Sequence, residues 1–94
     1  MIDRAAARRI AEQRLEELSE QLGQPLAIDD RATMRGAAGW LFFWNTRSYL
    51  EEGSISDALA GNGPLLVEGE TGAIDQLSSA ETLEGFAPAD DGDE

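Results

Sequence analysis

Trp40-Leu41-Phe42-Phe43-Trp44 is an unbroken run of five large apolar residues, and it limits the kind of sheet that the chain can form. In an extended segment, Trp40, Phe42 and Trp44 share one face while Leu41 and Phe43 occupy the other. Apolar side chains on both faces indicate a central strand, or one whose second face awaits a partner. Because other large side chains are few, we expect Trp40 and Phe42 in the core. For Trp44 the core is favoured over a binding surface.

Two hairpins are predicted around this run. Residues 26–34 alternate loosely between apolar and polar side chains, and the turn-rich segment 35–39 links them to the aromatic strand. Residues 64–68 and 73–77 predict a second hairpin, because the Gly69-Glu70-Thr71-Gly72 segment between them has turn chemistry. Between the hairpins, the chain is expected to continue as a strand and then form a long loop with a helical turn.

A helix is predicted before the first hairpin. Apolar side chains recur at three- and four-residue spacing from Ile2 to Leu22, which is typical of an amphipathic helix. Asp3 is a candidate N-cap, and Gly23 with the following Pro25 supplies the end.

A short last helix is predicted from the capping-box spacing of Ser78 and Glu81, and it should end near Pro88. The expected fold class is α+β, a small antiparallel four-stranded sheet with the N-terminal helix packed on one face and the short C-terminal helix, in the order α-β-β-β-β-α. With 94 residues there is room for one domain, assigned to 1–87. The acidic tail 88–94 is expected to be disordered, and its spacing does not fit a calcium loop.

The composition argues against catalysis. The chain has no cysteine and no histidine, which excludes thiol chemistry and removes the commonest general base and metal ligand. Paired carboxylates would need a deep cleft that so short a chain can hardly build. We therefore predict no enzymatic activity, no catalytic residues, no metal and no cofactor. The N-terminus has no continuous apolar run, which predicts a cytoplasmic protein without a membrane span.

The net charge of −12 is unevenly distributed: residues 48–94 hold twelve acidic residues and no basic one. Such a field repels nucleic acid and anionic membranes and attracts a basic protein surface. The residues proposed to contact a protein partner are Trp44, Tyr49, Glu51, Glu52, Asp57, Glu68 and Glu70. The competing interpretation is that these charges serve solubility.

The aromatic strand, together with two segments that come after it in the chain, carries a resemblance to a known family. Gly39–Trp44, the segment Arg47-Ser48-Tyr49-Leu50-Glu51-Glu52-Gly53 and the tract Leu59–Pro64 resemble the immunity protein 35 family, also called YrhB-like, over roughly residues 39–86. The resemblance implies an α+β fold and an immunity protein that neutralises a cognate bacterial polymorphic toxin by occlusion. It also implies structural roles for the motif residues Gly39, Trp40, Phe42, Gly61, Asn62, Pro64 and Gly72.

Other functions stay open at this point. A holdase-like small chaperone of the same family would use exposed apolar groups such as Leu41, Phe43, Leu50 or Ile55. A self-associating structural domain would form homo-oligomers, and the sequence does not decide the oligomeric state. A DNA mimic is disfavoured, because seven arginines balance seven acidic residues over residues 1–47.

Overall fold

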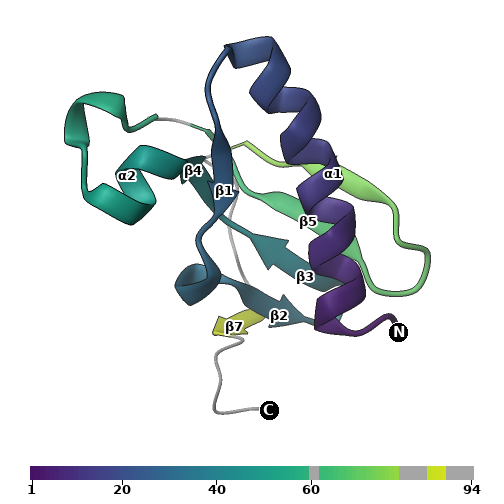
Figure 1. Cartoon of the computed structure of the whole chain (residues 1–94). Helices are drawn as coiled ribbons and strands as arrows, with labels where there is room; N and C mark the ends of the chain where they lie inside the picture. The colour runs from purple at the N-terminus through teal and green to yellow at the C-terminus, as the bar shows by residue number, and fades with distance from the viewer. Residues whose placement is uncertain (60–61, 79–84, 89–94) are drawn as a thin grey trace.

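The computed structural model describes residues 1–59, 62–78 and 85–88, and Figure 1 shows helix α1 lying across one face of a twisted sheet. The elements are, in chain order, α1 (Arg4–Leu22), β1 (Leu26–Ile28), the 3-10 turn η1 (Asp30–Ala32), β2 (Met34–Gly36), β3 (Gly39–Phe42), β4 (Trp44–Thr46), α2 (Arg47–Glu52), the 3-10 turn η2 (Ile55–Asp57), β5 (Leu65–Glu68), β6 (Ile74–Gln76) and β7 (Phe86–Pro88). Five strands form an antiparallel sheet in the order β6-β5-β3-β2-β7, and β1 pairs with β4 in a separate two-stranded sheet.

The predicted N-terminal helix is confirmed as α1. The Asp3 side chain accepts a hydrogen bond from the backbone N–H of Ala6 at 2.9 Å, and Gly23 ends the helix at φ +76°. The buried face of α1 carries small side chains, chiefly Ala7 and Ala11, which let the helix approach the sheet closely. No helix in the described part of the chain is long and apolar enough to cross a membrane.

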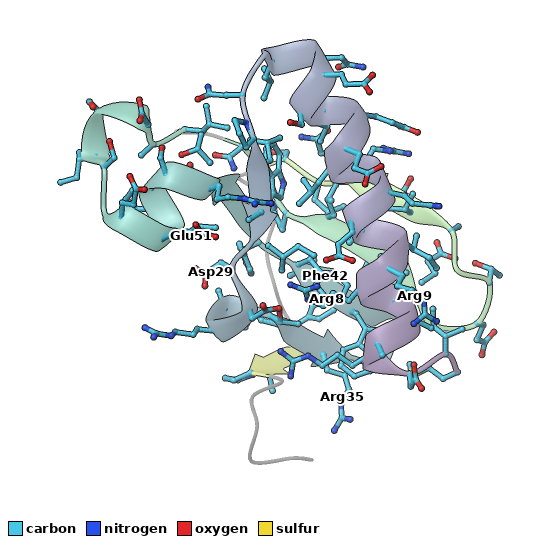
Figure 2. All side chains as sticks on the ribbon, viewed as in Figure 1. Arg8, Arg9, Asp29, Arg35, Phe42 and Glu51 are labelled. Carbon is cyan, nitrogen blue, oxygen red and sulfur yellow. The ribbon has the colours of Figure 1, made fainter. Side chains whose placement is uncertain are left out.

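The aromatic run forms the centre of the structure, as predicted. Strand β3 lies between β5 and β2, and Trp40 and Phe42 pack in the core cluster with α1. Leu41 faces the other side of the sheet and is equally inaccessible, at 0% exposure. Figure 2 labels Phe42 beneath α1. Apolar residues on both faces therefore do mark a central strand here.

The first hairpin is present but interrupted. The pairing is Met34↔Leu41 near the turn and Ile28↔Trp44 further out. Between these pairs, the first half of the hairpin holds three more residues than the second half, and η1 is three residues long. The first half therefore bulges out of the ladder at η1, and the hairpin splits into two sheets.

The second hairpin is confirmed as β5 and β6, paired through Val67↔Ile74. Gly72 has φ +76° in its turn, a conformation that glycine adopts without steric cost. The loop predicted between the hairpins is also as expected, since β4 continues the aromatic strand and is followed by α2 and η2.

The single four-stranded sheet and the helix ending near Pro88 are wrong. Phe86–Pro88 forms β7, which pairs with β2 through Gly36↔Phe86. A Cβ on Gly36 would lie 2.9 Å from the Phe86 ring, so this strand depends on a glycine 50 residues away in sequence. The rest of the expected helix (79–84) and of the tail (89–94) lies outside the described residues.

Candidate protein-binding surface

Residues 47–58, which we call the acidic arm, project from the body of the protein beside β4 (Figure 1). The arm begins where Thr46 accepts a hydrogen bond through its Oγ1 from the backbone N–H of Tyr49, at 3.2 Å. Gly53 reverses the chain at φ +74°. These two caps fix a helix of only six residues, which could not hold its shape by propensity alone.

Asp57 closes the arm on itself. Its Oδ2 accepts hydrogen bonds from the hydroxyls of Ser48 at 2.9 Å and Ser54 at 3.1 Å, which tie η2 to α2. Ile55 lies between Ser54 and Asp57 in sequence but is 80% exposed. Tyr49 is 38% exposed on the same arm. The arm therefore exposes the apolar side chain of Ile55 to solvent, while the hydrogen bonds to Asp57 hold the arm in its conformation.

The arm is anchored to β4 by two asparagines. Asn45 accepts a hydrogen bond from the Leu59 N–H at 2.8 Å and donates one to the Leu59 carbonyl at 3.2 Å. Asn62 donates to the Trp44 carbonyl at 2.7 Å, and the Trp44 indole donates to the Gly63 carbonyl at 2.9 Å. Trp44 is only 5% exposed, so it supports the arm from the core and is not on the surface.

The remaining residues proposed for partner contact fall into two groups. Tyr49, Glu51, Glu52 and Asp57 are all on the acidic arm. Glu68 and Glu70 lie at the turn of the second hairpin, across the molecule from the arm (Figure 1). There the Gly69 carbonyl accepts a hydrogen bond from the Ile2 N–H at 2.7 Å. These residues therefore do not form one continuous contact surface, because the two groups lie on different sides of the molecule.

The motif residues of the resemblance lie in the structural framework. Gly39 and Phe42 bound the central strand β3, and Pro64 is buried just before β5. Gly61 lies outside the described residues.

Beside the arm, β1 is flanked by two adjoining hollows that the sequence did not predict. One, of about 730 Å³, lies toward α1 and the other, of about 630 Å³, toward α2. Because both include Ala27, Ile28, Asp30 and Glu51, we treat them together as the acidic groove. Its charged lining comprises six carboxylates and three arginines, a formal charge of −3, contributed by Glu12, Glu16, Glu20, Asp29, Asp30, Glu51, Arg8, Arg31 and Arg47.

The positive charge of Arg8 is already paired with carboxylates of the groove. Its guanidinium donates to both carboxylate oxygens of Asp30, at 2.8 and 3.0 Å, and also contacts Glu12. The hydrogen bonding to Asp30 is the main reason that the pKa of Arg8 lies above its ordinary value, so Arg8 stays charged and paired. In Figure 2, Arg8 and Arg9 leave α1 on opposite sides. Two further carboxylates of α1, Glu16 and Glu20, line the groove.

The chemistry available at this surface is electrostatic. Within the residues that the structure describes, no three His, Cys, Asp or Glu side chains are grouped so that they could hold a metal ion. An open groove with six carboxylates in its lining suits a cationic protein segment better than a small apolar ligand.

Comparison with known proteins identifies a matching family and one similar protein. The family described as immunity protein 35 matches residues 5–88. The chain is 36% identical over 52 residues to the uncharacterized protein YrhB of Escherichia coli (strain K12), and the match covers 55% of each chain, so it spans about half the length of that relative. No solved structure matches the chain. Since the family match covers most of the sequence, the chain belongs to the immunity protein 35 family, as its aromatic strand and the motifs after it predicted.

Proposed function

We propose that this protein is an immunity protein that binds one cognate toxin and blocks its active site or the path of its substrate. Membership of the immunity protein 35 family implies toxin neutralisation. The observation that carries the proposal is Ile55, which is 80% exposed on a hydrogen-bonded arm that also carries the carboxylates of Glu51, Glu52 and Asp57. Such an arrangement joins an apolar anchor to charges that orient a partner.

Each part of the arm has a different task in this proposal. Burying Ile55 at an interface would contribute about 2 kcal/mol of binding free energy. Glu51 and Glu52 would raise the association rate with a basic toxin surface, since exposed charges act on approach more than on final affinity. The protein itself would carry out no reaction and would need no cofactor.

The test is co-expression with the product of the gene immediately upstream, as the candidate toxin, followed by pull-down and a growth-rescue assay. The native chain should form a complex and restore growth, whereas Ile55→Asp should lose most of both. Leu22→Asp is the matched control, because Leu22 is 48% exposed at the end of α1 and outside the arm. The proposal is refuted if the toxin is equally lethal with and without this protein.

A holdase-like chaperone is the second candidate, and Ile55 is again the observation that favours it. The other apolar groups expected to be exposed are not: Leu41 is buried at 0%, and Phe43 and Leu50 are half-buried. A chaperone would suppress aggregation of unrelated proteins at near-stoichiometric amounts, which a dedicated immunity protein would not do.

A further inference from the structure

Within the residues that the structure describes, the outer edge of β1 is a row of backbone hydrogen-bonding groups with no paired strand. Where the β1–β4 ladder extends past its ends, the Asp29 N–H donates to the Phe43 carbonyl at 2.8 Å and the Arg47 N–H donates to the Pro25 carbonyl at 3.0 Å. In an antiparallel pair, bonding alternates along the strand, so Ala27 also faces β4. The N–H and C=O groups of the two residues between these positions must point away from β4.

Those two residues are Leu26 and Ile28. Each residue as a whole, backbone included, is only 7% exposed. Their side chains lie in the core cluster, so the backbone edge is all that they offer to a partner. In the described part of the chain, no strand pairs with this edge. Unpaired strand edges are templates for another chain, and proteins usually cover them.

The opposite edge of the same two-stranded sheet is covered. The Trp44 carbonyl accepts a hydrogen bond from Asn62 at 2.7 Å, and the Thr46 N–H donates to the Asn45 side chain at 2.8 Å. Side chains therefore cover the β4 edge of the two-stranded sheet, whereas the β1 edge borders the acidic groove.

The groove has the charge to select what pairs with β1. Its lining carries a formal charge of −3, and Glu16 and Glu20 project from α1 on one side while Glu51 lies on the arm on the other. A strand placed in the groove would have its backbone opposite Leu26 and Ile28 and its side chains between these carboxylates. Basic side chains would be attracted there and acidic ones repelled.

We propose that β1 binds an extended basic segment of a partner protein by strand addition in the acidic groove. Two residues with free edges provide up to four main-chain hydrogen bonds, as in other modes of recognition by strand addition. The proposal deepens the proposed function, on which it rests for the identity of the natural partner, since it adds a second contact element next to the arm. The segment is defined by its extended backbone and positive charge.

The test uses synthetic peptides, so that it does not depend on finding the toxin. The probe is an eight-residue peptide of alternating Arg and Val, compared with an alternating Glu and Val peptide. A third peptide has the Arg and Val sequence with two adjacent central amides N-methylated, which blocks both of its edges. Binding is followed by amide hydrogen exchange measured by NMR at low salt.

The expected result is binding of the basic peptide, with exchange at Leu26 and Ile28 slowed by about tenfold or more. Ala27, whose N–H already faces β4, should change little. The acidic and N-methylated peptides should give no protection. The proposal is overturned if the basic peptide does not bind, if it binds without protecting these two amides, or if the N-methylated peptide binds equally well.

Charge variants give an independent arm of the test. Glu16→Lys should weaken binding of the basic peptide by about fivefold or more, because Glu16 lines the groove. Asp75→Lys changes the net charge equally at an exposed position on β6 that does not line the groove, so it should have little effect. Equal effects of both variants would mean attraction by overall charge alone, and protection of Leu26 that rises with protein concentration without peptide would mean self-pairing. Either outcome overturns the proposal.

Discussion

Gly39 begins the central strand in a conformation that other residues rarely adopt. Its φ is +147°, and a Cβ there would lie 2.1 Å from the carbonyl oxygen of Val67 and 2.7 Å from the nitrogen of Gly69. Both contacts are to backbone, which cannot swing aside as a side chain can. The glycine therefore allows β3 and β5 to approach each other at the end of their ladder.

Gly39→Ala should lower the free energy of unfolding by about 3 kcal/mol, because it combines backbone strain with a main-chain clash. Urea denaturation measures this loss. Gly53→Ala is the matched control, since Gly53 has φ +74° but nothing lies within 4 Å of an added Cβ. It should cost only about 1 kcal/mol. Equal losses would show that strain, and not the close approach of β5, sets the requirement.

Asn45 is a second residue whose side chain contributes to the stability of the fold, here through hydrogen bonds. Its side chain makes three hydrogen bonds, two with the backbone of Leu59 and one with its neighbour Thr46. Asn45→Ala should therefore lower the free energy of unfolding by about 2 kcal/mol, because backbone groups beneath the arm lose their partners. Asn62→Ala, which removes one hydrogen bond to Trp44, should cost about half as much in the same denaturation experiment. A larger loss for Asn62 would contradict this assignment.

The acidic arm is expected to open more readily than the sheet, because it depends on caps and serine–aspartate contacts and has no buried side chain in α2 or η2. Asp57→Ala removes the hydrogen bonds to Ser48 and Ser54. Amide exchange at Gly53 and Ala58 should become about tenfold faster, while the global free energy of unfolding changes little.

Glu52→Ala is the control for the arm, since it makes the same loss of charge at an exposed position on α2. It should leave the exchange rates of the arm unchanged. If both variants accelerate exchange alike, the arm responds to its charge and not to the contacts of Asp57.

The elements predicted correctly are those with local signals. Helix α1 has its cap, its periodicity and its terminal glycine within one segment, and β5–β6 has its turn between two apolar strands. The missed features depend on distant partners. The interruption at η1 accompanies the ion pair between Arg8 and Asp30, which are 22 residues apart, and β7 needs Gly36. Secondary-structure propensity reflects the local sequence, so it does not detect contacts between residues far apart in the chain.

The candidate surface was predicted only in part for a related reason. The charges of residues 1–47 balance when they are summed, so the sequence drew attention to the carboxylates of residues 51–57 and not to those of the groove along α1. The missed signal was the four-residue spacing of Glu12, Glu16 and Glu20, which places all three on one helical face. That β1 would lie opposite this face depended on the tertiary fold.

Considered as a whole, the protein carries an excess of negative charge that its ion pairs do not cancel. The chain has 19 acidic and seven basic residues, for a net charge of −12 at pH 7. Pairs such as Arg8–Asp30 and Arg14–Glu17 are formed by partly exposed side chains and contribute modestly. Repulsion among the remaining carboxylates opposes the compact state, and it is also the field that would steer a basic partner.

Raising NaCl from about 20 to about 500 mM should therefore increase the free energy of unfolding at pH 7 by about 1 kcal/mol, because salt screens repulsion that is stronger in the folded chain. Urea denaturation at each salt concentration measures the change. Repeating it near the isoelectric point, about 4.1, is the control, since the net charge is then close to zero and the salt effect should vanish. If salt lowers stability at pH 7, attractive pairs such as Arg8–Asp30 outweigh the repulsion. The negative field would then belong to the acidic arm and the acidic groove locally, and not to the molecule as a whole.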